Sequence, residues 1–455
     1  MAENKKKLIV IGGVAGGTSA AARARRVDRE LEIVIYEKGG FVSYDACDEP
    51  YYIKGDIESY ESLLVRSPQT FEEKSNIGIR LFHEVTGLDP QTKIVTVLDH
   101  KSGSTFEDRY DSLVIASGAY PRTIDVPGCN LPGIFQMKFI DQAVTIKEFL
   151  ASEKPKRAVI VGAGLVALEM AEALKSNGMD VTIVHRREKT GVGLEPEIVA
   201  VLHKMLDEAG VRFVGNAVVK EFVAGANDKV GVVKTTQGDI ETDMVLLGIG
   251  VIPALSFLED TGIELGPHGG LLTDERMETN IKGIFGAGDC CETMHRLSKQ
   301  PIFTPLGDVA NKHGRVAGAN AAGANETYTG SIAASQFKCF DLEIGTCGLT
   351  FEEAKEFFDP AQVTIEHSSR AHGQPKKQTI TMKLVADKKS RRLVGAQITG
   401  KEGAALRLNT LATIIQAGMT VDDMAELDFA YAPPFSPVID IILMGARVLL
   451  KKLDK

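Results

Sequence analysis

One arrangement of hydrophobic and polar positions occurs twice along the chain. Residues 7–38 and residues 157–188 each begin with a short apolar run, turn at closely spaced glycines, continue through an alanine-rich stretch and end in a β-branched run. Apolar runs bounded by turn residues predict buried strands, and the stretch between them predicts a helix. The pattern therefore predicts a strand–helix–strand unit at both places.

The remaining apolar runs extend these units and then change character. Short runs at 111–117 and 243–250 contain or end in turn residues, which is typical of further strands in the same sheets. Farther on, residues 379–400 alternate as an antiparallel hairpin does, and residues 406–418 read as an amphipathic helix closed by glycine. We expect an α/β fold with two Rossmann-like dinucleotide-binding domains and a C-terminal α+β domain. The expected boundaries are 1–120 with 251–328, then 121–250, then 329–455.

Composition narrows the classes of partner. The 455 residues are 44% hydrophobic with a formal net charge of −9, which argues against nucleic acid because proteins that bind it carry a basic surface. The first apolar run is too short for a signal peptide, and no run approaches the ~20 apolar residues that cross a bilayer. We therefore expect no membrane partner and a cytoplasmic location. The six cysteines show no Cys-x-x-Cys pair and no zinc-like spacing, so we expect free thiols and no metal.

The glycine loop of the second unit matches a dinucleotide-binding pattern. Gly162, Gly164 and Ala167 follow the form GxGxxA between the expected strand and helix. The first glycine makes the tight turn, the second lets a pyrophosphate approach the backbone, and the small third residue allows helix and strand to pack closely. This context predicts a nicotinamide dinucleotide site.

The second strand of that unit ends in a basic segment. His185 occupies the place of the usual ribose-binding acid, and Arg186 and Arg187 follow it. Arginine at this place suits a 2′-phosphate, so NADPH is favoured over NADH. The alternative is that Glu188 binds the ribose and that the arginines lie on a solvated loop.

The first unit departs from the pattern. Gly12 and Gly17 flank Val14, which stands where the middle glycine is expected, but the second strand ends in Glu37, which is placed to accept hydrogen bonds from a ribose diol. Asp289 follows a later Gly-x-Gly turn and is a candidate for a ribitol hydroxyl. The helix expected soon after it, from about residue 307, is placed to direct its positive end at the pyrimidine edge of a flavin.

These motifs together are similar to those of a known family. The segments "IVIGGVAGG", "PYY" after Cys47, "IASGA", "GIFGAGD", "ANKHGR" and "YAPPFSPV" resemble the single-cysteine branch of the FAD-dependent pyridine nucleotide-disulfide oxidoreductases. That branch includes coenzyme A disulfide reductases, NAD(P)H polysulfide or persulfide reductases and NADH oxidases. The resemblance implies a homodimer formed through the C-terminal domain, with Tyr431 reaching the active site of the partner.

The resemblance also implies two cofactor-binding sets. FAD would be held by Gly12, Ala15, Gly16, Glu37, Lys38, Ser43, Val85, Ser117, Gly118, Asp289 and Ala310. NADPH or NADH would be held by Gly162, Gly164, Leu165, Val166, Glu169, His185, Arg186, Arg187 and Gly250. Coenzyme A is a further candidate ligand, with substrate-binding positions Ser19, Arg23, Arg26 and Lys74.

Cys47 is the catalytic candidate. No second cysteine lies in its segment, so its redox partner must come from outside: a thiol such as coenzyme A, a sulfane sulfur, or oxygen giving a sulfenic acid. A helix N-terminus would lower the pKa of this thiol, whereas the neighbouring Asp48 and Glu49 would raise it. Two carboxylates are unusual beside a thiol that accepts anionic sulfur compounds, unless both are exposed. "AHGQPK", with Gly373 and Gln374 where coenzyme A disulfide reductases have tyrosines, favours a smaller sulfur substrate.

The leading hypothesis is an oxidoreductase that uses NAD(P)H and FAD to reduce a disulfide, persulfide or polysulfide through Cys47. Three alternatives remain on the same scaffold: a water-forming NAD(P)H oxidase, a flavoprotein reductase of a small electron carrier, and a thiol redox sensor. A histidine in the first glycine loop would indicate a peroxidase, and this chain has Ala15 there.

Overall fold

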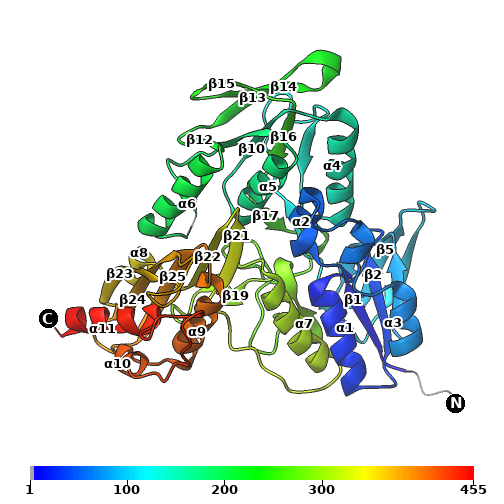
Figure 1. The fold of residues 1–455 in the computed structure, drawn as a ribbon. Helices are drawn as coiled ribbons and strands as arrows, with labels where there is room; N and C mark the ends of the chain where they lie inside the picture. Colours follow the sequence, from blue (N-terminus) through cyan, green and yellow to red (C-terminus); the bar gives the residue numbers. More distant parts are fainter. Residues whose placement is uncertain (1–4, 192, 455) are drawn as a thin grey trace.

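The computed structural model describes residues 5–191 and 193–454 and shows three parts (Figure 1). The first part contains a parallel sheet in the order β18-β7-β1-β2-β3. Its strands are β1 Lys7–Ile11, β2 Glu32–Glu37, β3 Gly78–Leu81, β7 Ser112–Ile115 and β18 Ile284–Gly286. The helices beside it are α1 Ala15–Val27, α3 Pro68–Ser75 and α7 Gly307–Ala321, whereas α2 Glu49–Lys54 packs against helices of the second part. The first predicted strand–helix–strand unit is confirmed.

The second part repeats this design. Its parallel sheet has the order β12-β11-β10-β16-β9. The strands are β9 Ile134–Gln136, β10 Arg157–Val161, β11 Asp180–Val184, β12 Arg212–Val214 and β16 Met244–Leu247, and the helices are α4 Ile140–Glu153, α5 Leu165–Ser176 and α6 Pro196–Glu208. The second predicted unit is therefore confirmed, and parallel strand pairing on both sides of β10 brings the carboxyl ends of the strands together at one sheet edge.

Smaller sheets complete these two parts. Three-stranded antiparallel sheets are formed by β4 His83–Asp89, β5 Ile94–Asp99 and β6 Thr105–Arg109, and by β13 Val219–Ala224, β14 Val230–Thr235 and β15 Gly238–Glu241. β19 Thr293–Met294 pairs with β20 Pro301–Ile302. Where the chain passes between the two parts, β8 Ala119–Pro121 pairs with β17 Val251–Pro253. The domain boundaries given above stay a prediction.

The third part is an antiparallel sheet in the order β21-β22-β25-β24-β23, with helices packed against it. Its strands are β21 Ser335–Cys339, β22 Leu342–Gly348, β23 Pro360–Ser368, β24 Thr379–Asp387 and β25 Leu393–Gly400. Its helices are α8 Phe351–Ala354, α9 Ala404–Ala417, α10 Val421–Ala425 and α11 Ile441–Leu453. The predicted hairpin is β24 with β25, and the predicted helix is α9.

The polar face of that hairpin is buried, although alternation is typical of a sheet with one solvated face. Ile380, Met382 and Leu384 belong to the core that includes α9, α10 and α11. Lys383 lies between them on the opposite face and is only 4% exposed, because α6 of the second part packs against β24 and β25. The C-terminal sheet is thus covered by the nucleotide-binding part of the same chain.

Two composition-based expectations concern the chain as a whole. In the described part of the chain, no helix combines the length and the apolar character needed to cross a bilayer. All six cysteines are free thiols. Residues 1–4, which precede the first apolar run, lie outside the described residues.

Candidate active site

The first glycine loop holds its backbone close to neighbouring strands. Gly12 has a φ of 98°, and a Cβ at this position would lie 2.2 Å from the backbone oxygen of Ala116. Only glycine fits such a turn. α1 begins at Ala15, and no described side chain caps its N-terminus at Val14. The first amides of α1 therefore remain available to a phosphate.

A cavity of about 210 Å³ continues from this loop. Glu37 accepts hydrogen bonds from the amides of Gly13 and Gly39 at 2.7 Å each, and its burial raises the pKa of the carboxyl group. The Ser117 hydroxyl is buried and has no hydrogen-bond partner among the described residues. The lining includes Gly12, Glu37, Lys38, Val85 and Ser117. An orphaned hydroxyl, a fixed carboxylate and an open glycine loop fit the adenosine and pyrophosphate of FAD.

The second glycine loop has the same construction. Gly162 has a φ of 111°, and a Cβ there would lie 2.1 Å from the Gly248 oxygen. A Cβ at Gly164 would meet no described protein atom within 4 Å, so this side of the loop is open to a ligand. Leu165 and Val166 begin α5 and are 38% and 42% exposed, although both are apolar. These features fit a second dinucleotide that lies across the start of α5.

The basic segment after β11 lies beside that loop in the fold. The Arg186 and Arg187 side chains are exposed, whereas His185 is buried. Burial lowers the pKa of His185, and the charges of Arg187 and Arg186 lower it further. The imidazole is therefore neutral at physiological pH, and the positive charge of the segment comes from the arginines. Gly250, with a φ of 95°, follows β16 in the same part of the chain.

Cys47 is an exposed thiol at the start of α7. It lies in a single helical turn that precedes α2, and its Sγ is 4.0 Å from the point where a Cβ of Gly307, the first residue of α7, would stand. The positive end of α7 favours a thiolate. Desolvation and the charge of Glu169 outweigh the lowering effect of Lys138, and the pKa of Cys47 is raised above its ordinary value.

Glu49 is buried, which the sequence left open. Its side chain is 1% exposed at the start of α2, and its Oε1 has no hydrogen-bond partner within the described ranges. Burial raises the pKa of Glu49 to about 8, in spite of the lowering effect of Lys138. Asp48 is only half-buried. The two carboxyl groups beside Cys47 therefore differ: Glu49 is mostly protonated at neutral pH, and its neighbour faces solvent.

Sequence reasoning missed Lys138. Its Nζ lies 2.6 Å from Asp289, the candidate for a ribitol hydroxyl, and its charge partly opposes the rise in the pKa of both Cys47 and Glu49. The sequence offers a single indication of this role, a lysine that stands directly after an apolar run and before a helix. Lysines occur commonly at such positions without any role in a site. Cys290 and Cys291 follow Asp289 and are buried, as expected for packing residues.

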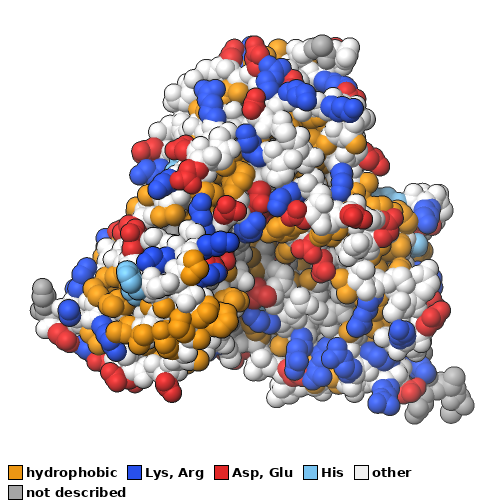
Figure 2. Space-filling view, in the orientation of Figure 1, with side chains coloured by type: hydrophobic (Ala, Val, Ile, Leu, Met, Phe, Trp, Pro, Cys, Tyr) orange, Lys and Arg blue, Asp and Glu red, His pale blue; other side chains and the backbone are white. Residues whose placement is uncertain are grey.

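A larger cavity of about 760 Å³ lies between α7 and α9 and is lined by Cys47. Figure 2 shows a recess between the C-terminal part and the part built around α7. Arg296 contributes positive charge to the lining, where Lys312 is paired with Asp308 at 2.9 Å. This cavity gives a small molecule access to the thiol.

The other expected site residues do not line the two cavities described above. Ser19 lies between α1 and α7 and donates to Asn311 at 2.5 Å, whereas Arg23 is paired with Glu326. Arg26 and Lys74 are exposed and lie outside the lining of the 760 Å³ cavity. Ser43, Gly118 and Ala310 lie near the first glycine loop or its neighbours, and Tyr431 is 46% exposed in the C-terminal part.

Comparisons with known proteins agree with this architecture. The family model described as pyridine nucleotide-disulphide oxidoreductase matches residues 6–322, and that of its dimerisation domain matches residues 334–441. The NAD(P)H coenzyme A polysulfide/persulfide reductase of Pyrococcus horikoshii is 34% identical over 452 residues, covering 99% of this chain and 100% of that protein.

Two further relatives are similar over nearly the whole chain. The NADH oxidase of Methanocaldococcus jannaschii is 30% identical over 450 residues, covering 98% of this chain and 99% of that protein. The solved structure of a NAD-dependent persulfide reductase from A. fulgidus has a TM-score of 0.94 and 35% identity, and the match covers 98% of this chain and 84% of that one. The predicted resemblance is confirmed.

Proposed function

This chain belongs to the pyridine nucleotide-disulphide oxidoreductase family, and from that premise we propose that it reduces a disulfide, persulfide or polysulfide through Cys47. It is an enzyme that takes electrons from NAD(P)H and uses FAD. Coenzyme A is a candidate component of the substrate, because the Pyrococcus horikoshii relative is named for it. The assignment of individual binding residues given above is part of this proposal.

One observation carries the proposal. Cys47 is the exposed thiol that lines the 760 Å³ cavity, and it stands where the first dinucleotide-binding part meets the positive end of α7. A thiol in this position is open to a sulfur substrate through the cavity, and FAD held at the first glycine loop would supply it with electrons. FAD supplies the two-electron relay between the nicotinamide and the sulfur.

The residues of the chain have separate tasks in this reaction. The Cys47 thiolate attacks one sulfur of the substrate, forms a mixed disulfide and releases the other sulfur as a thiolate. Two electrons and two protons from NAD(P)H and solvent then regenerate the Cys47 thiol and release the second product thiol. Arg296 attracts an anionic substrate, and the start of α7 stabilises negative charge on Sγ.

The acceptor is identified by anaerobic assays. Purified FAD-loaded protein is mixed with NADPH or NADH, and polysulfide and coenzyme A disulfide are offered in turn while nicotinamide absorbance is followed. We expect turnover with at least one sulfur acceptor. Turnover should be faster with polysulfide, because Gly373 and Gln374 stand where coenzyme A disulfide reductases have tyrosines, which favours a smaller substrate. Absence of anaerobic turnover with both coenzymes and both acceptors would contradict the proposal.

A second candidate is water-forming NAD(P)H oxidation. The observation that favours it is the similarity to the Methanocaldococcus jannaschii NADH oxidase over 98% of this chain. An oxidase consumes oxygen at the rate at which NAD(P)H disappears and requires no sulfur acceptor. Oxygen uptake that is fast in air and unaffected by polysulfide would favour this reading.

The active unit is proposed to be a homodimer. The dimerisation-domain match covers residues 334–441, and apolar side chains gather over the C-terminal part in Figure 2. Leu406 and Phe435 are each 77% exposed and Val438 is 70% exposed, which is unusual for large apolar residues unless another surface covers them.

Leu406→Glu should therefore convert the dimer to monomer, because a carboxylate at a buried subunit interface is desolvated without a partner. Sedimentation equilibrium of the FAD-loaded protein measures the change, and we expect the dimer dissociation constant to rise at least about 100-fold. Val218→Glu, at an apolar residue that is 51% exposed in the second part, is the matched control and should leave the dimer intact. An unchanged dimer in Leu406→Glu would contradict this interface.

The proposal also includes a cellular location and a class of substrate. A cytoplasmic location is supported by six free cysteines, which persist in a reducing compartment. A small-molecule substrate, with no nucleic-acid partner, is supported by the net charge of −9.

A further inference from the structure

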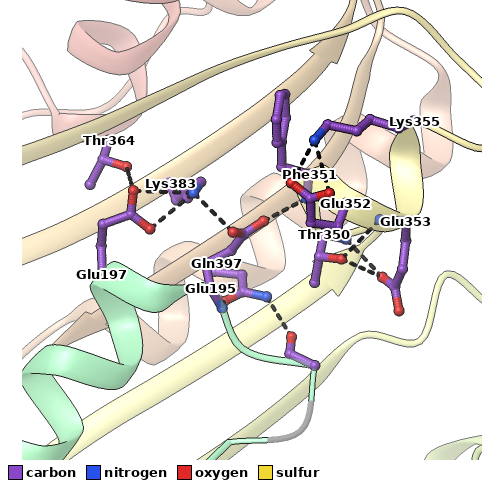
Figure 3. Close-up of polar contacts among 11 residues, drawn as sticks. Glu195, Glu197, Thr350, Phe351, Glu352, Glu353, Lys355, Thr364, Lys383 and Gln397 are labelled. Carbon is purple, nitrogen blue, oxygen red and sulfur yellow. Dashed lines mark hydrogen bonds and ion pairs between the residues drawn. The ribbon is translucent and has the colours of Figure 1, made fainter. Parts of the chain in front are cut away.

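The loop that carries Arg186 and Arg187 ends on side chains of the C-terminal part. It connects β11 to α6, and its last residues make polar contacts with β24, β25 and the start of α8 (Figure 3). These three elements lie outside the nucleotide-binding part and more than 150 residues later in the sequence. The contacts on the side of the loop and α6 are made by Gly193, Glu195 and Glu197.

The Gln397 side-chain amide both donates a hydrogen bond to the loop backbone and accepts one from it. Its Nε2 donates to the Gly193 carbonyl at 2.7 Å, and its Oε1 accepts from the Glu195 amide at 2.7 Å. Gln397 is 3% exposed, so these bonds are shielded from water. A buried side-chain amide that satisfies both the Gly193 carbonyl and the Glu195 amide holds these two residues against β25.

Lys383 fixes the side chain at the end of the same loop. Its Nζ lies 2.9 Å from the Glu195 carboxylate and 2.9 Å from the Glu197 carboxylate. The Glu197 carboxylate also accepts a hydrogen bond from the Thr364 hydroxyl at 3.1 Å. The amide of Phe351 donates to the Glu195 carboxylate at 2.6 Å. The Lys383 side chain is 5% exposed, and the two carboxylates satisfy the requirement that a buried charge be paired.

The strand register explains why these side chains act together. Thr364, Lys383 and Gln397 are direct cross-strand partners on β23, β24 and β25, so they point to one face of the sheet. α6 begins opposite this row with Glu195 at its N-cap, where negative charge is favoured by the helix dipole. Within this row, Lys383 and Gln397 contact the end of the loop, whereas Thr364 contacts only Glu197 in the first turn of α6.

We propose that Lys383 and Gln397 are positioning residues for the nicotinamide nucleotide: they anchor Gly193 and Glu195, at the end of the loop that begins with Arg186 and Arg187, and thereby favour the placement of these arginines at the nucleotide. This inference deepens the proposed function and rests on its NAD(P)H dependence. The two residues touch the loop and not the ligand, so they change affinity for the adenosine end of the nucleotide. Because preorganisation lowers the ordering cost of binding, loosening the loop weakens binding without altering the chemical step.

The test uses 2′-phospho-ADP-ribose and ADP-ribose, which contain the adenosine end of NADPH and NADH but no nicotinamide. Dissociation constants are measured by calorimetry on FAD-loaded wild type and Gln397→Met, which keeps side-chain length but lacks both hydrogen bonds. We expect binding of 2′-phospho-ADP-ribose to weaken about tenfold and binding of ADP-ribose to weaken less. The KM for the preferred nucleotide should rise by a similar factor while kcat stays within about twofold.

Two controls separate positioning from general stability. Thr364→Val removes a hydrogen bond at the far end of the same cluster, on Glu197, and should leave both dissociation constants unchanged. Arg186→Ala combined with Arg187→Ala shows the effect of losing direct phosphate contact. Amide hydrogen exchange in peptides that cover residues 185–195 should accelerate in Gln397→Met and not in Thr364→Val.

Glu195→Gln is the second variant in case Gln397→Met does not fold with FAD, because it keeps the side-chain size and leaves Lys383 paired with Glu197. Dissociation constants within twofold of wild type in a folded variant would overturn the inference and leave the proposed function standing. If wild type binds only ADP-ribose, the dissociation constants of wild type and variants are compared for ADP-ribose alone. If wild type binds neither ligand, the proposed NAD(P)H dependence fails together with the inference.

Discussion

Cys47→Ser should lower kcat for the sulfur acceptor at least about 1,000-fold, because a serine hydroxyl does not ionise near neutral pH and forms no disulfide. Reduction of bound FAD by NAD(P)H should remain within about twofold of wild type, since the two glycine loops are untouched. Stopped-flow absorbance under anaerobic conditions measures both steps separately. A fast first step and an absent second step would place the loss at the sulfur.

Cys129→Ser is the control, because Cys129 is a free, half-buried thiol of the second part and does not line the 760 Å³ cavity. The outcomes divide the alternatives. Cys47→Ser that still consumes oxygen but releases peroxide would favour the oxidase. Full activity toward a protein electron carrier would favour a flavoprotein reductase in which the thiol is dispensable.

The pH dependence of wild type follows from the environment of Cys47. Its pKa lies above the ordinary value, with desolvation as the largest cause and Glu169 as the second, so the thiol form predominates at pH 7. The rate of attack on a sulfur acceptor should therefore rise with pH through the neutral range as the thiolate fraction increases. The profile of kcat/KM for the acceptor checks this, and a rate that falls steadily above pH 7 would contradict it.

Glu49→Gln should stabilise the protein at pH 8 and have little effect near pH 4.5. The folded pKa of Glu49 is about 8, whereas a carboxyl group in an unfolded chain titrates near its ordinary value. Between these values the folded state holds a proton that the unfolded state has lost, so wild-type stability falls as pH rises. Glutamine does not titrate, and we expect its advantage at pH 8 to be roughly 4 kcal/mol in the free energy of unfolding.

Chemical denaturation of FAD-loaded protein at pH 4.5, 6 and 8 measures this difference. Asp48→Asn is the matched control: Asp48 adjoins Cys47 as well but is half-buried, so its substitution should change stability far less at every pH. A Glu49→Gln advantage that does not grow with pH would show that Glu49 is already ionised in the native state. Such a result would mean that Lys138 compensates the buried charge.

Local pattern was sufficient for most of the architecture. The two strand–helix–strand units, α7, α9 and the β24–β25 hairpin were predictable because each is defined by consecutive residues whose periodicity and turn residues agree. The glycine loops were predictable for the same reason, since a turn with φ near 100° admits little except glycine. The resemblance to the family rested on these local segments.

The residues that modify the site were not predictable in this way. Lys138 reaches Asp289 across 151 positions of sequence, and Gln397 reaches Gly193 across 204. A lysine or a glutamine is common in such sequence contexts. The roles of Lys138 and Gln397 therefore become visible only through their tertiary contacts. The burial of Glu49 depends in the same way on the packing of α2 against α4 and α5, which the sequence does not reveal.

The Gln397 and Glu195 contacts have a consequence for engineering coenzyme preference. A chimera that receives only residues 185–195 from a relative would place a foreign loop against an unchanged β24–β25 surface. The backbone of the foreign loop would then have to form hydrogen bonds with the buried Gln397 of this chain. Mutant libraries restricted to the loop would therefore sample mainly misaligned loops. Libraries that vary positions 383 and 397 together with the loop should yield the larger changes in preference.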